Sequence, residues 1–224
     1  IWNKNNIKIC FLTNNSAKNQ MQLAKKLKLM GLIVKKKSII STSVATANYL
    51  VENFKLNTKI YVIGSMSLKK TIFKEGFISD NLNAKIVVAG LDKKISYNKI
   101  HLASKLVRKG AILIGTNPDK IFPSDRDFKP GAGTIIQAIK TASYDAKSIN
   151  IGKPNPYFVN TAVRYLGLEK KNVILIGDQL ETDILAANNS NIASILINTG
   201  VENKNKKIKP SLSINSLMEL PISR

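Results

Sequence analysis

The stretch ILIGDQLETD, residues 174–183, decides the fold of this chain. It begins as a short apolar strand and ends in a glycine, which is followed by a carboxylate at the strand tip, Asp178, and a second one five positions later, Asp183. The second carboxylate falls at the start of the following helix, so both can point into one pocket. Oxygen ligands at a strand end suit Mg²⁺, which takes one or two carboxylates plus waters and phosphate oxygens. On this pattern alone, Asp178 could equally start a turn and Asp183 cap a helix.

Short apolar runs alternate with amphipathic stretches along all 224 residues. The expected strands are 7–13, 38–41, 59–63, 85–89, 111–115, 173–176 and 194–197. The expected helices are 21–30, 44–54, 68–75, 97–108, 132–143, 156–166 and 184–188, and 116–130 is expected to be a loop. Apolar strands between helices predict parallel sheets covered on both faces, a doubly wound α/β fold. In such sheets, ligands bind at the carboxyl ends of the strands.

The composition excludes several classes of protein. Hydrophobic residues make up 44% of the chain, so disorder is not its main state. The single cysteine, Cys10, can form neither an internal disulfide nor a thiolate metal cage and is expected to be a small buried hydrophobe. No apolar run approaches the ~18–20 residues of a membrane span, and residues 1–6 do not show the apolar region of a signal peptide. We therefore expect a cytoplasmic protein without a membrane partner and, because residue 1 is not Met, a fragment.

The charge balance is strongly basic, with 35 Lys and Arg against 14 Asp and Glu, a net charge of +21. Such a field attracts polyanions or phosphorylated small molecules. The lysines are scattered among Asn and Ile, and the denser clusters at 35–37 and 204–209 are not interleaved with aromatic residues that could stack on bases. Nucleic acid is therefore not expected as the main partner, and a nucleic-acid binder remains only the third hypothesis.

Two further motifs follow expected strands or precede expected helices. Thr13-Asn14-Asn15-Ser16 offers hydroxyl and amide donors before a helix, an arrangement typical of a phosphate cradle, although Ser16 alone could be an ordinary N-cap. In Gly152-Lys153-Pro154-Asn155-Pro156, prolines hold a lysine just before a helix, which supplies a fixed positive charge for a phosphate.

TNNS (13–16), GKPNP (152–156) and GDQLETDI (177–184), in this order, resemble the haloacid dehalogenase superfamily of phosphatases, most closely its NagD-like or para-nitrophenylphosphatase branch. The resemblance extends to 40–43, 116–119 and 130–133. It implies a doubly wound core, 1–41 and 148–224, interrupted by an inserted α/β cap domain, 42–147. The cap would close over the leaving group of the substrate and could also mediate a homodimer.

The resemblance also implies roles for single residues. Thr13, Asn14 and Asn15 would bind the transferring phosphoryl group, and Lys153 would compensate its charge. Asp178 would ligate Mg²⁺, whereas Asp183 would support the metal, its water or Lys153. Lys153, Asp183 and Thr13 would thus form the catalytic set within the chain. Asn117 and Asp119, at a strand end of the cap, would contact the substrate or dock on the core.

The superfamily's reaction also needs an Asp-x-Asp motif on the first strand, where one Asp attacks phosphorus and the other acts as general acid and base. No Asp precedes Asp80, and Asp125-Arg126-Asp127 follows no expected strand. The missing strand would lie between 7–13 and 173–177. We therefore expect a further N-terminal segment, direct pairing of these two runs, or a chain that is unstable alone.

The leading hypothesis is a Mg²⁺-dependent phosphomonoester hydrolase that acts on a small organic phosphate through an aspartyl-phosphate and is inactive as this chain. The alternative is a non-catalytic phosphometabolite-binding pseudoenzyme of the same fold. His101, the only histidine, has no partner motif and is expected to lie on the surface or in packing contacts.

Overall fold

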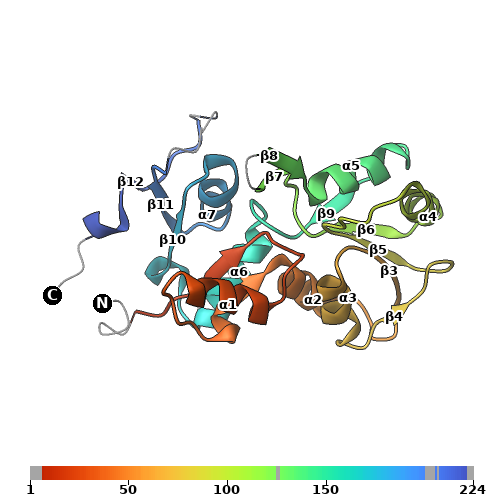
Figure 1. Cartoon of the computed structure of the whole chain (residues 1–224), viewed down its shortest axis with the longest axis horizontal. Helices are drawn as coiled ribbons and strands as arrows, with labels where there is room; N and C mark the ends of the chain where they lie inside the picture. The colour runs from red at the N-terminus through yellow and green to blue at the C-terminus, as the bar shows by residue number, and fades with distance from the viewer. Residues whose placement is uncertain (1–6, 125–126, 200–204, 206, 221–224) are drawn as a thin grey trace. The chain divides into compact units, whose positions relative to one another are not determined.

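The computed structural model describes residues 7–124, 127–199, 205 and 207–220 of the chain (Figure 1). The chain divides into two compact units, of which unit 1 comprises residues 1–12 and 153–224 and unit 2 comprises residues 13–152. Each is an α/β unit built on a parallel sheet. The predicted α/β fold with parallel sheets is confirmed.

Unit 2 is organised around a five-stranded parallel sheet with the order β4-β3-β5-β6-β9. Its strands are β4 (Ile78–Ser79), β3 (Lys59–Ile63), β5 (Ile86–Ala89), β6 (Ile112–Gly115) and β9 (Ser148–Asn150). The helices are α1 (Gln20–Leu29), α2 (Thr42–Asn53), α3 (Met66–Phe73), α4 (Tyr97–Arg108) and α5 (Ala132–Thr141). A 3₁₀ turn, η2 (Lys36–Ser38), precedes β2 (Ile39–Ser41).

Helices cover both faces of this sheet because its central strands are apolar on both sides. On one face, Val87 and Leu113 pack with Leu106 of α4 and Ile139 of α5. Figure 1 shows α2 and α3 on the opposite face. Each fully buried aliphatic side chain of this kind contributes about 1.5–3 kcal/mol to folding.

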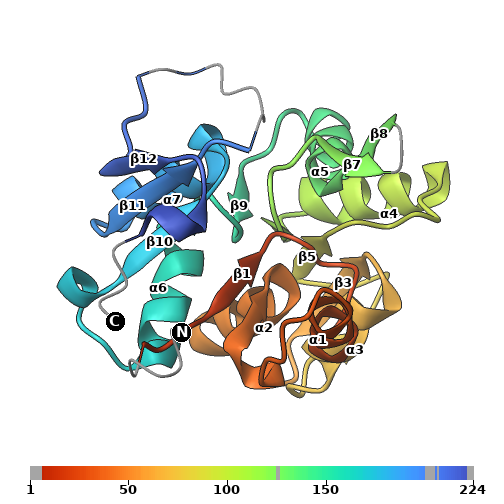
Figure 2. The same cartoon turned by 60° about the vertical axis from the view of Figure 1, so that its left-hand side comes forward.

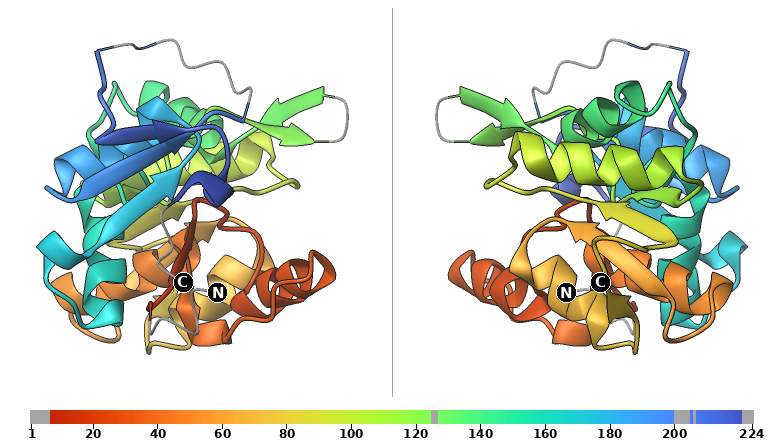
Figure 3. Two further views of the ribbon diagram at one scale, coloured as in Figure 1. Left: turned by 90° about the vertical axis from the view of Figure 1, so that its left-hand side faces the viewer. Right: turned by 90° about the vertical axis from the view of Figure 1, so that its right-hand side faces the viewer.

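The predicted loop over 116–130 contains a β-hairpin that the sequence did not reveal. Strands β7 (Ile121–Ser124) and β8 (Asp127–Pro130) pair antiparallel, from Ile121 opposite Pro130 to Ser124 opposite Asp127. Figure 3 shows the hairpin extending beyond α4 and α5. Two prolines and two aspartates obscure the strand pattern in the sequence, because both residue types are depleted in strands.

Unit 1 contains a three-stranded parallel sheet with the order β10-β11-β12 (Figure 2). The strands are β10 (Ile174–Gly177), β11 (Ala193–Ile197) and β12 (Leu212–Ile214). The helices and turns are α6 (Pro156–Leu166), η3 (Lys170–Asn172), the π-helical turn η4 (Leu180–Ile184), α7 (Leu185–Asn189) and η5 (Leu217–Glu219). Val163 of α6, Leu175 of β10 and Ala187 of α7 share one buried cluster.

The strand predicted over 7–13 is shorter in the structure. Only β1 (Phe11–Thr13) is extended and paired, and its partner is β2. Within the described part of the chain, β10 pairs with β11 alone, and no strand of the chain lies between β1 and β10 in a common sheet. The direct pairing of 7–13 with 173–177 is therefore wrong.

The two compact units do not coincide with the predicted core and cap. Segments 13–41 and 148–152, both predicted for the core, are grouped with 42–147 in unit 2. Segment 148–152 belongs to unit 2 because its strand β9 pairs with β6. Segment 13–41 belongs to unit 2 in part because Ser43 and Ser65 both donate hydrogen bonds to the carbonyl of Ser16. The functional division into core and cap remains a prediction.

Several predicted features lie outside the described residues. These are Asp125 and Arg126 of the Asp-x-Asp segment, Lys204 and Lys206 of the basic cluster, and residues 1–6. Over the ranges that the structure describes, no helix combines the length and apolar character that crossing a membrane requires.

Candidate active site

The central contact of unit 1 is an ion pair between Lys153 and Asp183. Lys153 lies just ahead of α6 and Asp183 lies in η4, and the Lys153 Nζ is 2.5 Å from the Asp183 Oδ1. Their side chains are only 14% and 8% exposed. The Asp183 Oδ2 accepts a hydrogen bond from the Gln179 backbone N–H at 3.3 Å. Both carboxylate oxygens are therefore engaged, as a buried charge requires.

Gly177 makes this arrangement possible at the tip of β10. A Cβ on residue 177 would lie 2.3 Å from both the Cβ and the Cγ of Asp183, closer than atoms can approach. The glycine therefore lets the Asp183 side chain lie directly on the strand end. Asp178 follows Gly177 and is half-buried, and its Oδ2 accepts from the Thr199 hydroxyl at 3.4 Å. The two acids and Lys153 thus all belong to unit 1.

The donor set fits a hard divalent cation through Asp178 more directly than through Asp183. The Asp183 carboxylate is buried and ion-paired with Lys153, whereas the Asp178 carboxylate, which accepts from Thr199, is half-buried at the carboxyl end of a parallel strand. No group of three or more His, Cys, Asp or Glu side chains gathers anywhere in the described ranges. Mg²⁺ keeps several waters and uses one or two protein carboxylates plus phosphate oxygens, so a single carboxylate such as Asp178 is compatible with it.

In unit 2, the loop that follows β1 is fixed by its own polar side chains. The Thr13 Oγ1 accepts from the Asn15 N–H at 3.2 Å, and the Asn15 Oδ1 accepts from Ala17 N and Lys18 N at 2.9 and 3.0 Å. The N-cap of α1 is Asn19 rather than Ser16, because the Asn19 side chain accepts from the Gln22 N–H. The alternative of Ser16 as an ordinary cap is therefore wrong.

Asn117 and Asp119 contact this loop within unit 2. The Asn14 Nδ2 donates to both carboxylate oxygens of Asp119, at 3.1 and 3.2 Å. The Asn117 Nδ2 donates to the Asn14 carbonyl at 2.8 Å, and Asn117 is buried. Of the two predicted roles, these contacts favour attachment of the 13–16 loop over contact with a substrate.

Three residues to which the sequence analysis assigned no role hold this loop. The Ser16 carbonyl accepts from the hydroxyls of Ser43 and Ser65, and the Ser16 Oγ accepts from the Leu91 N–H at 3.2 Å. Gly152 packs beneath the loop, since a Cβ there would lie 2.6 Å from the Asn14 Oδ1. The available signal was the Ser or Thr that follows an expected strand at 43 and 65, where hydroxyls commonly bond to the backbone.

His101 and Cys10, for which the sequence analysis expected no catalytic role, have no catalytic environment in the structure. His101 is exposed on α4 and stacks on Tyr97. Cys10 is half-buried, and burial raises the pKa of its thiol to about 12, so it remains protonated at neutral pH.

Comparisons with known proteins identify the class. A family model described as haloacid dehalogenase-like hydrolase matches residues 1–78, and one described as HAD-hydrolase-like matches residues 150–220. The chain is 36% identical over 220 residues to the acid sugar phosphatase of Staphylococcus epidermidis (strain ATCC 12228), covering 96% of this chain and 84% of that protein. It is 32% identical over 213 residues to the 5′-nucleotidase YutF of Bacillus subtilis (strain 168), covering 93% and 82%.

A solved structure is similarly close. A double mutant of the thermostable NPPase from Geobacillus stearothermophilus matches with a TM-score of 0.93 and 35% identity, covering 98% of this chain and 88% of that one. The chain therefore belongs to the haloacid dehalogenase-like hydrolase family. Within it, the chain is a NagD-like phosphatase, which defines it as a phosphoric monoester hydrolase.

Proposed function

We propose that the protein hydrolyses a small organic phosphate in a Mg²⁺-dependent reaction that passes through an aspartyl-phosphate. The observation that carries the proposal is the buried Lys153–Asp183 pair beside Asp178 at the end of β10. A lysine this well shielded from water is costly unless its charge is used, and a phosphate ester supplies two or more negative charges for it.

Lys153 compensates the negative charge on the phosphoryl oxygens, and Asp183 holds its ammonium in place. Because the pair is largely excluded from water, the attraction between the ammonium and a phosphate oxygen is stronger than on the surface. Asp183 is thus a positioning residue in this proposal, in agreement with one of the roles that the resemblance implied.

Asp178 is the residue that would hold the Mg²⁺. When bound there, the ion would neutralise charge on the phosphate oxygens. The Thr199 hydroxyl, at 3.4 Å from the Asp178 Oδ2, orients the carboxylate. Asp183 would contribute through Lys153 rather than as a ligand of its own.

Thr13, Asn14 and Asn15 are proposed as phosphoryl-binding residues. The Thr13 Oγ1 already accepts from the Asn15 N–H, so its hydroxyl hydrogen is oriented away from that bond and can be donated to an anion. The Asn14 amide is engaged by Asp119, which leaves binding by Asn14 to its main chain. Substitution of Thr13 by Ala is expected to weaken phosphate binding without unfolding the loop.

Turnover is proposed to require a nucleophile that these 224 residues lack, since no Asp precedes Asp80. The test is hydrolysis of para-nitrophenyl phosphate with Mg²⁺ by this chain and by a version extended at its N-terminus with an Asp-x-Asp strand. We expect no measurable turnover by the chain itself and turnover by the extended version. Strong activity of the chain itself would refute the nucleophile assignment. An inactive extended version that still binds phosphate would favour the pseudoenzyme.

The substrate is proposed to be a small phosphate ester, since relatives are named for sugar phosphates and for a 5′-nucleotide. We also propose a cytoplasmic location, on the basis of the single cysteine. A homodimer formed through residues 42–147 remains a prediction.

A further inference from the structure

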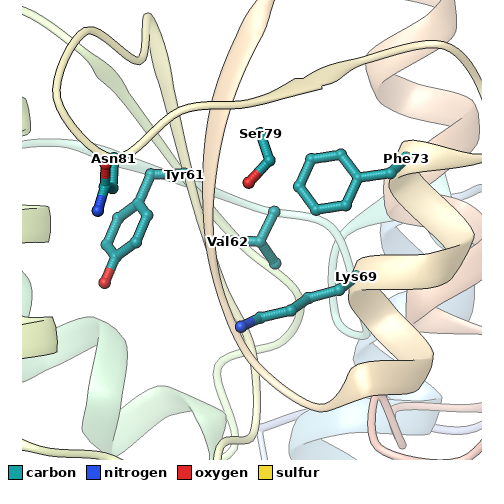
Figure 4. Close-up of a pocket in the computed structure, with 6 residues that line it drawn as sticks. All are labelled: Tyr61, Val62, Lys69, Phe73, Ser79 and Asn81. Carbon is teal, nitrogen blue, oxygen red and sulfur yellow. The ribbon is translucent and has the colours of Figure 1, made fainter.

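Unit 2 contains a pocket of about 310 Å³, beside the sheet edge at β3. Its walls come from three elements, as Figure 4 shows: Tyr61 and Val62 from β3, Lys69 and Phe73 from α3, and Ser79 and Asn81 from the end of β4 and the turn after it. All six residues belong to one compact unit. The volume is within the range of pockets that bind small molecules.

The pocket exists because β4 is too short to cover β3. The register pairs Lys59 with Ile78 and Ile60 with Ser79, and the pairing ends there. From Tyr61 onward, no other strand in the described ranges lies on that side of β3. The space that a longer strand would fill is left between α3 and the turn at Asn81.

Lys69 gives the pocket a positive charge. It is the one charged residue among the six that line it, and its ammonium has no carboxylate partner in the part of the chain that the structure describes. The nearby acids are engaged elsewhere. Asp80 pairs with Lys59 at 3.0 Å, and Asp92 pairs with Lys99 at 2.7 Å.

The other lining groups suit a flat molecule with hydrogen-bond acceptors. The Ser79 side chain has no hydrogen-bond partner within the described ranges and lies on the same side of β3 as Lys69 and Phe73, so its hydroxyl can face a ligand (Figure 4). The ring of Phe73 provides aromatic surface on the same side of β3 as Lys69, and Val62 is a buried apolar contact there. The Tyr61 ring lies on the other side of the strand and packs against the core under α4 and α5 (Figure 4).

We propose that this pocket binds a small aromatic carboxylate, with the carboxylate on Lys69 and the ring against Phe73. A singly charged anion matches the single ammonium, whereas a doubly charged phosphate would leave one charge without a partner in a partly apolar site. The proposal concerns a site that lies within unit 2 and does not use Lys153, Asp178 or Asp183.

Benzoate is the probe, and benzamide is its neutral counterpart of nearly the same shape. Binding is measured by NMR titration of the ¹⁵N-labelled full chain. We expect benzoate to shift the amides of 61–62, 69–73 and 79–81 in a saturable manner and to bind about tenfold more tightly than benzamide, since a charge-assisted hydrogen bond is worth about one power of ten.

Lys69→Gln is the test variant and Lys70→Gln, the exposed neighbour on the same helix, is the matched control. We expect Lys69→Gln to weaken benzoate binding about tenfold and Lys70→Gln to change it less than twofold. Phe73→Leu should weaken benzoate and benzamide alike, because it removes only the ring contact. Unchanged amide positions away from the pocket verify that each variant is folded.

The absence of a saturable shift on addition of benzoate would overturn the proposal. Equal losses of benzoate affinity for Lys69→Gln and Lys70→Gln would also overturn it, because they would indicate general attraction of benzoate to the basic surface. Lys153→Gln separates this result from the phosphatase proposal. It should leave benzoate affinity within twofold while it weakens phosphate binding.

Discussion

At the scale of the residue, Asp183 holds Lys153 at 2.5 Å while the Gln179 N–H holds its other oxygen. A second lysine–carboxylate pair in unit 1, Lys171 with Glu169 at 2.7 Å, offers the same chemistry on the surface, with side chains 75% and 71% exposed. The two pairs differ chiefly in their access to water. Comparison of the two therefore isolates what burial contributes.

Asp183→Asn is expected to lower the free energy of unfolding by about 2–3 kcal/mol, because it leaves a largely buried ammonium without its counter-charge. Glu169→Gln should change it by less than about 0.5 kcal/mol, since exposed pairs contribute little. Urea denaturation followed by circular dichroism measures both. Equal effects would show that the Lys153–Asp183 pair is as well solvated as the surface pair.

Gly177 illustrates what the sequence could and could not predict about the site. The resemblance placed Lys153, Asp178 and Asp183 in one site, and the structure brings these three together in unit 1. The separate roles of Asp178 and Asp183 could not be predicted, because sequence spacing does not show that Asp183 has a donor on each oxygen. The position of the Asp183 carboxylate depends on Gly177, which has no Cβ and therefore lets the carboxylate lie on the strand end.

At the scale of the element, α6 is set by signals at both of its ends. Asn155 is the N-cap and its side chain accepts from the Tyr157 N–H at 2.8 Å, Pro156 is the first helical residue, and Gly167 ends the helix in the left-handed conformation at φ 61°. Both ends of this helix were predicted correctly because each has a known local chemistry. The same holds for α4, which Ser96 caps.

Asn155→Ala is expected to cost about 1 kcal/mol of stability, because the Tyr157 N–H loses its acceptor at the start of the helix. Asn155→Asp keeps an acceptor at that position and should cost much less. Thermal unfolding of the two variants checks the difference. If both variants melt together, the side chain acts through a contact other than the cap.

The turn between β4 and β5 depends on an ionised Asp80. Hydrogen bonds from the backbone N–H groups of Asn83 and Leu82, together with Lys59, lower the pKa of Asp80 from 3.8 to about 2. A carboxyl whose pKa is lowered on folding stabilises the native state fully above pH 3.8 and loses that contribution as the pH falls through about 2.

Asp80→Asn should therefore flatten the pH dependence of stability between pH 4 and 2, whereas the unmodified chain loses stability over that range. Unfolding midpoints measured at several pH values across it provide the test. A parallel decline in both proteins would contradict the role of the Asp80 charge.

The elements that sequence reasoning missed are short or atypical in composition. β4 has two residues, and β9 (Ser148–Asn150) contains one apolar residue, so neither produces a recognisable apolar run. The predicted strand over 7–13 was too long because β2, its partner in the sheet, has only three residues. Strand length here is set by the partner strand, which a local pattern does not contain.

At the scale of the whole molecule, the net charge of +21 opposes folding through repulsion among lysines. Salt screens charges separated by more than about 30 Å at 0.01 M but about 10 Å at 0.1 M. We therefore expect the melting temperature to rise by several degrees when NaCl is increased from about 0.01 M to about 0.3 M. Differential scanning fluorimetry measures the shift. An unchanged or lower melting temperature would mean that the lysines do not repel one another appreciably in the folded state.

The pairing of β10 has a consequence for how a catalytic centre could be assembled. Among the described residues, this strand pairs only with β11, and it carries Asp178 just beyond its carboxyl end. A parallel strand that paired with the other edge of β10 would lie about 4.8 Å away and deliver its own tip next to that carboxylate. Main-chain complementation by a separate peptide would therefore bring a new side chain into register with Asp178, so that association and chemistry would depend on the same ladder of hydrogen bonds.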